Sequence, residues 1–258
     1  MRHLVILACA VFVLADVRGF GADESVVALR SVRTGTLTYP ALDNVDFREG
    51  TIECWIRLAF DPATLVPPQE FQGLATLLSV QGEKGGFNIG YSAQKGQAVP
   101  SWWCSMSPKP IVYSMGITNI LMKPGEWHHI AITWKGQETA SFFDGKPGGT
   151  AKQNAFLYQA FGPLGAAPLL IGDKWNYNAL YVVDDFRISR VARKAEELGF
   201  HGELKPDAFT TVLDPFEGDF DPDGKALTKP LIIAAGEGGL PSAQCRFVEG
   251  RFGKGLAF

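Results

Sequence analysis

The chain has 258 residues, of which 46% are hydrophobic, so it is long enough to bury the core of one large domain. Its formal net charge is -3 at pH 7 and no long block of like charge occurs, which argues against nucleic acid as a partner. Its 29 glycines and 16 prolines indicate many turns and few long helices.

The first 22 residues have the pattern of a signal peptide. A basic start at Met1-Arg2-His3 precedes an unbroken apolar run from Leu4 to Leu14. This run is too short to span a bilayer and fits the hydrophobic region of a signal peptide, with small residues at Gly21 and Ala22 for cleavage. We therefore expect a secreted, periplasmic or cell-surface protein. The alternative is a buried N-terminal helix, and no later segment is apolar for long enough to be a transmembrane segment.

Short strands dominate the region from Val26 to Ile188. Residues 51–58 alternate with period two, which places Ile52, Cys54 and Ile56 on one face of a strand. Further strands are predicted at residues 73–80, 86–91, 102–106, 111–115, 127–134, 139–143, 169–172 and 179–188. Asp144-Gly145 predicts a tight hairpin, because a type I′ turn needs positive φ at both central positions.

Helical spacing occurs only after Ile188. Val191, Ala195 and Leu198 fall at i, i+4 and i+7, which predicts one short surface helix near residues 193–199. Many short strands with almost no helix predict an all-β fold, an antiparallel two-sheet β-sandwich with one short C-terminal helix. We expect each sheet to have one buried face and one face in water.

Four segments carry a family pattern in order along the chain: residues 47–56, 123–134, 141–146, and 170–172 followed by 183–188. Their sequences, FREGTIECWI, KPGEWHHIAITW, SFFDGK, and LIG with VDDFRI, resemble those of the laminin-G-like jelly-roll family. This family belongs to the concanavalin A-like lectin and glucanase superfamily. The resemblance implies one jelly-roll domain over residues 23–200, and it implies far less about function.

Residues 201–258 form a C-terminal extension. Within it, residues 211–220 and 250–258 resemble the opening strands of a second such domain. Either the chain is a truncated product of a longer two-domain protein, or these strands pair back onto the first sandwich. The second alternative is favoured, because unpaired apolar edge strands promote aggregation.

Two pairs of adjacent residues suggest catalysis or metal binding, but their spacing argues against both. His128 and His129 point to opposite faces of a strand, so they cannot easily bind one ion, and the resemblance implies a structural role for them. Asp184 and Asp185 diverge in the same way, and one is predicted to be buried with Arg187 on the Asp185 side.

Calcium is a possible cofactor, with Asp173 or Asp184 as candidate ligands, because hard cations require several oxygen atoms. A zinc site is not expected, because the chain has no CxxC or HxxxH pair. After signal cleavage three cysteines remain, Cys54, Cys104 and Cys245. Cys54 is expected to be a small buried residue, and no disulfide is assigned.

An enzyme is not expected. Glucanases of the superfamily carry E-x-D-x-x-E on one strand, whereas Glu49 and Glu53 lack both the intervening Asp and the third acid. The sequence also contains no GxSxG elbow, phosphate-binding loop or dinucleotide-binding motif.

The six tryptophans divide into two groups. Trp55, Trp127 and Trp134 lie in the family segments and are expected in the core. Trp102, Trp103 and Trp175 are less constrained, and the neighbours Trp102 and Trp103 cannot both face the core. Trp103, Trp175 and Tyr177 are the predicted ligand contacts, because exposed rings stack on sugars and anchor interfaces, although they could equally cover the sandwich edge. We expect an exported module that binds carbohydrate or another extracellular ligand. The alternatives are a structural or protein-interaction domain of a larger cell-surface protein, and a glycan-active enzyme.

Overall fold

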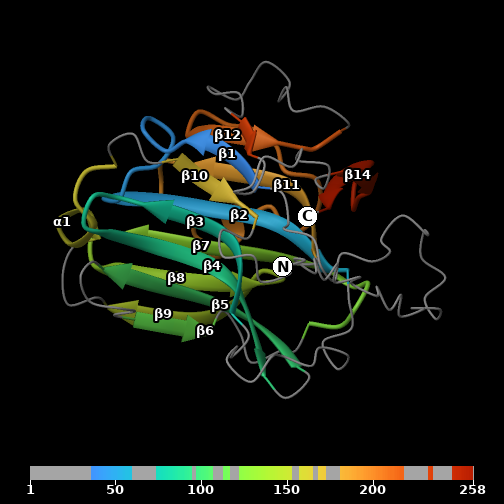
Figure 1. Ribbon diagram of the computed structural model, residues 1–258, viewed down its shortest axis with the longest axis horizontal. Coiled ribbons are helices and arrows are strands. Elements are labelled where there is room, and N and C mark those ends of the chain that lie inside the picture. The colour runs from blue at the N-terminus through green and yellow to red at the C-terminus, as the bar shows by residue number, and fades with distance from the viewer. Residues whose placement is uncertain are drawn as a thin grey trace, which may run out of the picture.

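The computed structural model describes residues 36–59, 74–94, 97–106, 113–116, 122–152, 157–164, 168–172, 181–217, 232–234 and 246–257. These residues form two antiparallel sheets packed face to face (Figure 1). The predicted all-β sandwich is therefore confirmed. No helix in this part of the chain is both long and apolar enough to cross a membrane.

The first sheet has the strand order β13-β1-β10-β3-β4-β5-β6. Its strands are β1 (Thr36–Pro40), β3 (Leu74–Gln81), β4 (Gly85–Gln94), β5 (Gln97–Met106), β6 (Tyr113–Gly116), β10 (Pro168–Ile171) and β13 (Ile232–Ala234). The second has the order β14-β15-β11-β2-β7-β8-β9, and β12 pairs with β11 beside this path. Its strands are β2 (Glu49–Leu58), β7 (Trp127–Lys135), β8 (Glu138–Phe143), β9 (Lys146–Lys152), β11 (Tyr181–Ser189), β12 (Thr210–Asp214), β14 (Arg246–Glu249) and β15 (Lys254–Ala257).

The predicted hairpin joins β8 to β9. Asp144 and Gly145 both have positive φ, 48° and 71°, and Phe143 pairs directly with Lys146 across the two-residue loop. The dipeptide thus adopts the geometry that its sequence predicts.

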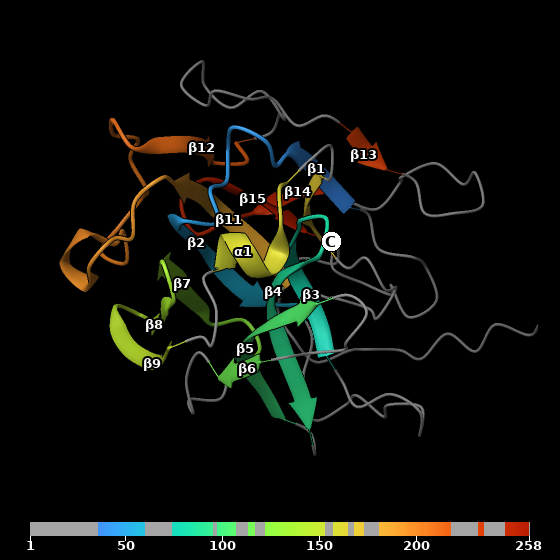
Figure 2. The same cartoon turned by 90° about the vertical axis from the view of Figure 1, so that its left-hand side faces the viewer.

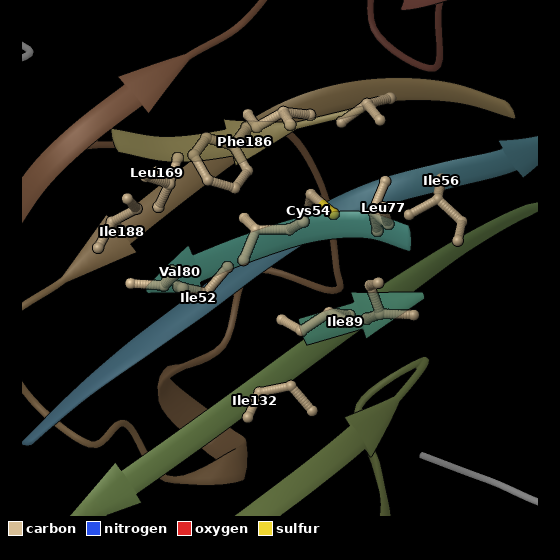
Figure 3. Packing of buried hydrophobic residues seen from close by; sticks show 14 of the residues in the cluster. Ile52, Cys54, Ile56, Leu77, Val80, Ile89, Ile132, Leu169, Phe186 and Ile188 are labelled. Carbon is tan, nitrogen blue, oxygen red and sulfur yellow. The ribbon is translucent and has the colours of Figure 1, made fainter. Parts of the chain in front are cut away.

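The main core lies between the two sheets. Ile52, Cys54 and Ile56 of β2 point into it together, as the period-two pattern predicts, and meet side chains of the opposite sheet (Figure 3). Cys54 is a free cysteine with 3% of its surface exposed, and burial raises the pKa of its thiol. The prediction of a small buried residue is confirmed for Cys54.

The outer face of the second sheet is not in water, which corrects the expectation from alternation. All nine residues of β11 are buried. In β2 and β7, residues that point to either face of the sheet are buried as well. Leu198 and Phe200, in the segment after β11, pack over Ala131 and Phe142. Alternation places polar residues on the side away from the core, but it does not predict that a later segment will cover them.

The strands after residue 201 pair back onto the sandwich. β12 and β15 both pair with the free edge of β11, and β13 pairs with β1. The C-terminal extension therefore covers an edge of each sheet, which Figure 2 shows at the upper side of the molecule.

The helices are shorter than the sequence pattern predicts. The expected helix near residues 193–199 is a single 3₁₀ turn, Ala195–Glu197. Lys194 before the turn and Leu198 after it are both extended, and Arg193 is anchored to Ser189 and Asp207. A five-residue helix that the pattern did not indicate, α1 (Leu157–Phe161), lies at one end of the sandwich.

Candidate functional site

An open groove of about 560 Å³ lies at the end of the sandwich that carries α1, within the size range of ligand pockets. Three separate segments line it: the turn at residues 42–48, α1 with residues 162–164, and Arg190. This end faces the viewer in Figure 2, where α1 lies in front.

The turn between β1 and β2 forms the first wall of the groove. The backbone amides of Asn44 and Val45 donate to the carbonyl oxygen of Ala41 at 3.2 and 2.9 Å, and Asn44 Nδ2 donates to Pro40 at 2.8 Å. Asp43 takes a left-handed conformation (φ 69°), which aspartate tolerates better than most residues. The turn leaves the Leu42 side chain 58% exposed.

The second wall is α1, which one buried aromatic residue anchors. Phe161 is 1% exposed and packs edge-on against Phe47, with ring centroids 5.0 Å apart. Gly162 (φ 71°) follows the helix, as is common for a residue that ends one. Tyr158, in the first turn of the helix, is 40% exposed and lines the groove.

Charged groups of both signs line the groove that holds the exposed tyrosine. The Arg48 guanidinium lies 5.9 Å from the centroid of the Tyr158 ring and 3.4 Å from Asp46. Across the groove, Arg190 Nη2 donates to the carbonyl oxygen of Asp43 at 2.9 Å. An aromatic face beside guanidinium donors and carboxylate acceptors can stack on a sugar ring and bind its hydroxyl groups.

A buried polar network occupies the outer face of the second sheet. Glu53 Oε1 accepts from Arg187 Nε and Nη2 at 2.9 and 2.5 Å. Glu53 Oε2 lies 3.1 Å from His129 Nε2 and accepts from the Gly199 amide at 2.9 Å. Burial alone would raise the pKa of Glu53, but the hydrogen bond from His129 and the charge of Arg187 lower it. The carboxylate is enclosed and serves the fold.

The two adjacent histidines diverge, as predicted. His129 reaches Glu53, whereas His128 Nδ1 lies 2.9 Å from Asp144 Oδ2 on the hairpin. The His129 amide donates to the other Asp144 oxygen at 2.8 Å. Burial would raise the pKa of Asp144, but these hydrogen bonds lower it. The rings therefore hold elements together and do not share an ion.

Asp184 and Asp185 lie in a bulge of β11, where Asp185 has a φ of 47°. Asp184 Oδ2 accepts from the amides of Arg251 and Phe252 at 2.6 and 2.9 Å, and Asp185 Oδ2 accepts from the Leu204 amide at 2.7 Å. Both carboxyls are buried, although only one was expected to be, and Arg187 pairs with Glu53 and not with Asp185.

The calcium prediction depends on residues beyond those described. Asp184 Oδ1 is buried and has no hydrogen-bond partner, as a metal ligand could. However, no group of three or more His, Cys, Asp or Glu side chains in the described ranges is placed to hold a metal ion. Asp173 lies outside these ranges, so its part in a calcium site stays a prediction.

The two buried aspartates predict an unusual pH dependence of stability. Burial raises the pKa of Asp184 to about 6 and that of Asp185 to about 7, although amide donors act in the opposite direction. The folded chain therefore binds more protons than the unfolded chain, whose aspartates titrate near pH ~3.9. The free energy of unfolding should fall as pH rises through 6 and 7, by about 1–3 kcal/mol between pH 5 and 8. Urea unfolding at each pH measures it.

Asp185→Asn supplies the control, because asparagine also tolerates positive φ and can still accept the Leu204 hydrogen bond. This variant should show a shallower fall between pH 5 and 8. Glu53 and Asp144 do not affect the stability between pH 5 and 8, because their pKa values are lowered in the folded chain. The stability that these two carboxylates contribute is lost only at lower pH, as the pH falls through each folded pKa. An unchanged slope in Asp185→Asn would contradict the assignment.

The described residues do not test the predicted ligand contacts. Trp103 lies on β5, where its backbone is in register with that of Asn88 on β4. Trp175 and Tyr177 lie outside the described residues, so all three stay predictions.

The three tryptophans expected in the core have different positions. Trp134 is in the main core at 1% exposed. Trp55 is buried on the outer face, where its Nε1 donates to the Gly202 carbonyl oxygen at 3.3 Å. Trp127 is only half-buried, with Arg57 5.2 Å from its ring centroid.

The groove residues were missed by sequence reasoning. Tyr158 lies in a five-residue helix that is too short to show periodicity, and Arg48 was noticed only as part of a strand segment. The turn residues Asp43 and Asn44 were the available signal, since such residues mark tight turns, but they do not indicate a ligand.

Comparison with known proteins identifies relatives by fold. The family model for the concanavalin A-like lectin/glucanases superfamily matches residues 32–199. No curated protein sequence matches the chain. The crystal structure of a candidate carbohydrate binding protein from Bacteroides ovatus is similar at 13% identity, with a TM-score of 0.53 over 76% of this chain and 55% of that chain.

Two further structures match less closely. The heptameric SAP-like pentraxin from Limulus polyphemus has 13% identity and a TM-score of 0.42, over 72% of this chain and 94% of that chain. The CBM40 module of Ruminococcus gnavus IT-sialidase, bound to alpha2,6 sialyllactose, has 12% identity and a TM-score of 0.45, over 67% and 96% of the two chains.

Proposed function

Since the chain belongs to the concanavalin A-like lectin/glucanase superfamily, we propose that it is an exported, non-catalytic module that binds carbohydrate in the groove beside α1. The observation that carries the proposal is the exposed Tyr158 ring, which lies in an open groove between charged donors and acceptors. The Bacteroides ovatus protein, described as a candidate carbohydrate binding protein, has a similar fold and supports the same function.

The absence of catalysis is proposed because the best-placed carboxylates serve the fold. Glu53 is 1% exposed and already accepts hydrogen bonds from Arg187 and Gly199. Asp184 and Asp185 are buried under backbone amides, so a substrate has no access to them. Hydrolysis of a glycosidic bond needs two reachable carboxyl groups on either side of the bond. In the groove, the carboxylates are those of Asp43 and Asp46, and Asp46 is already paired with Arg48 at 3.4 Å. Export is proposed from the pattern of the first 22 residues.

A glycan array probed with the purified full chain, with and without calcium, tests the proposed function. Selective binding to one class of sugar is the expected result. Loss of binding on adding a chelator would show that calcium takes part and would support the prediction of Asp173 or Asp184 as a ligand. If folded protein binds no glycan, the proposal is wrong, and a structural or protein-interaction role becomes the better explanation.

Tyr158→Ala is expected to weaken binding to the glycan that the array identifies by about tenfold, because stacking on an aromatic ring contributes about 0.5–1.5 kcal/mol beyond its buried area. Isothermal titration calorimetry measures the change. Tyr158→Phe keeps the ring face and should retain most of the affinity. The ring is exposed, so neither variant should alter the thermal unfolding midpoint by much. Equal affinities for all three proteins would remove Tyr158 from the site.

A further inference from the structure

Three large hydrophobic side chains are exposed among the described residues: Leu42 at 58%, Tyr158 at 40% and Phe209 at 53%. Single exposed hydrophobic residues are ordinary on protein surfaces, whereas a group of them marks an interaction site. Leu42 and Tyr158 line the groove. Phe209 does not line it, so its position relative to the groove decides whether it belongs to the same surface.

Hydrogen bonds place Phe209 beside the groove. The Arg190 amide donates to the Phe209 carbonyl oxygen at 2.9 Å, while the Arg190 guanidinium donates to Asp43, next to Leu42. Two residues further along, Thr211 Oγ1 donates to the Asn44 carbonyl oxygen at 2.8 Å. The start of β12 therefore lies against the same turn that forms the first wall of the groove.

The segment that carries Phe209 is held firmly. The Phe209 amide donates to Asp207 Oδ1 at 3.0 Å, and the same aspartate accepts from Arg193 Nη2 at 2.8 and 2.7 Å. These hydrogen bonds fix the backbone that presents the Phe209 ring, so this backbone does not have to be ordered when a ligand binds. Phe209 is therefore suited to act as a contact even though water surrounds half of its surface.

The charges around the groove balance. Asp43 and Asp46 oppose Arg48 and Arg190, and Arg48 already lies 3.4 Å from Asp46. A site for an acidic glycan would need a surplus of cationic groups, since charge complementarity steers such ligands. Two guanidinium groups that donate and two carboxylates that accept instead suit the hydroxyl groups of an uncharged sugar.

We infer that the site continues past the groove onto Phe209 and takes an uncharged oligosaccharide, which contacts Tyr158 at one end and Leu42 and Phe209 at the other. This inference rests on the proposed function. The family match ends at residue 199, so Phe209 lies beyond it and the C-terminal extension supplies one part of the site. The extension thus has a role in binding as well as in covering the sheet edges.

Calorimetry with neutral gluco-, xylo-, manno- and galacto-oligosaccharides of two to six units tests the inference on the full chain. Wild-type affinity should rise with chain length in at least one series. Phe209→Ala should weaken binding of the six-unit ligand about fivefold and leave binding of the two-unit ligand unchanged, because only the longer chain reaches Phe209. Phe209→Tyr keeps the ring and should restore the dependence on length.

Glu203→Ala, an exposed position in the same extension with no contact to the groove, is the matched control and should match wild type at every length. If wild type binds oligosaccharides but Phe209→Ala keeps the full dependence on length, the inference fails while the proposed function stands. Binding confined to acidic glycans and abolished by salt would also overturn it. If wild type binds no glycan at all, both fail together.

Discussion

Glu53→Ala is expected to lower the free energy of unfolding by about 3–5 kcal/mol, because it leaves the Arg187 guanidinium buried without its partner. The Arg187 side chain is 6% exposed and that of Glu53 is 0% exposed. The guanidinium cannot lose its proton, so water must enter or the segment above must move. Because folded proteins are stable by only about 5–15 kcal/mol, the loss is a large share of the total.

The segment above Glu53 makes the effect larger than that of one ion pair. The Gly199 amide donates to Glu53 Oε2 at 2.9 Å, and the neighbouring Leu198 packs over Ala131 and Phe142. Removal of the carboxylate therefore also loosens the cover of the outer face. Glu53→Gln keeps the shape and loses the charge, so we expect a smaller loss of about 1–3 kcal/mol.

Urea unfolding followed by tryptophan fluorescence measures these losses, with Glu49→Ala as the matched control. Glu49 lies on the same strand, but its side chain is 31% exposed, pairs with Lys135, which is 69% exposed, and accepts one amide hydrogen bond, from Ala192 at 3.2 Å. An ion pair of this kind contributes about 0–1 kcal/mol. Because interactions in the folded state lower the pKa of Glu53, the difference between wild type and Glu53→Ala should shrink as pH falls through that folded pKa. Similar losses at the two positions would contradict the argument.

The strands were predictable because their apolar residues alternate over a few neighbours in sequence. Ile52 and Cys54 enter the core together for this reason alone. The same alternation assigned the face of Glu53 to water, and this was wrong because the segment at Gly199, far along the chain, packs there. A local pattern indicates which face of a strand is polar, but it carries no information on what later packs there.

The residues of the groove could not be predicted from local sequence patterns either. Asp43, Tyr158 and Arg190 come from a turn, a short helix and the end of a strand, more than thirty residues apart. None of these segments has a periodic pattern or a motif that points to a ligand. Only the sandwich fold brings them together, so the sequence predicted a binding module without the residues that now form its candidate site.

Trp134→Ala is the second change for which a large effect is expected, about 3–5 kcal/mol lost from the free energy of unfolding. The indole is 1% exposed and packs against Phe87, with ring centroids 5.2 Å apart. It also lies on the backbone of Gly50, where any Cβ would overlap the indole ring. Neighbours held in two sheets cannot collapse to fill the space that alanine would leave.

A double-mutant cycle tests that packing. Gly50→Ala alone should be strongly destabilising because the new methyl group meets the indole. In a Trp134→Phe background the smaller ring leaves room, so the added cost of Gly50→Ala should fall by at least about 1 kcal/mol. Urea unfolding of the four proteins gives the coupling, and strictly additive losses would contradict the contact.

Trp134→Phe also connects the core to the groove. Trp134 Nε1 donates to the Asp46 carbonyl oxygen at 2.7 Å, and Asp46 belongs to the turn that forms the first wall. Phenylalanine fills most of the space of the indole, so the fold should remain. It has no N–H group, so the turn loses its hydrogen bond to the core. We expect about 1–3 kcal/mol of lost stability together with weaker glycan binding, because a loosened wall must be ordered again when the ligand binds. Full affinity in Trp134→Phe would mean that the hydrogen bonds within the turn suffice to hold the groove.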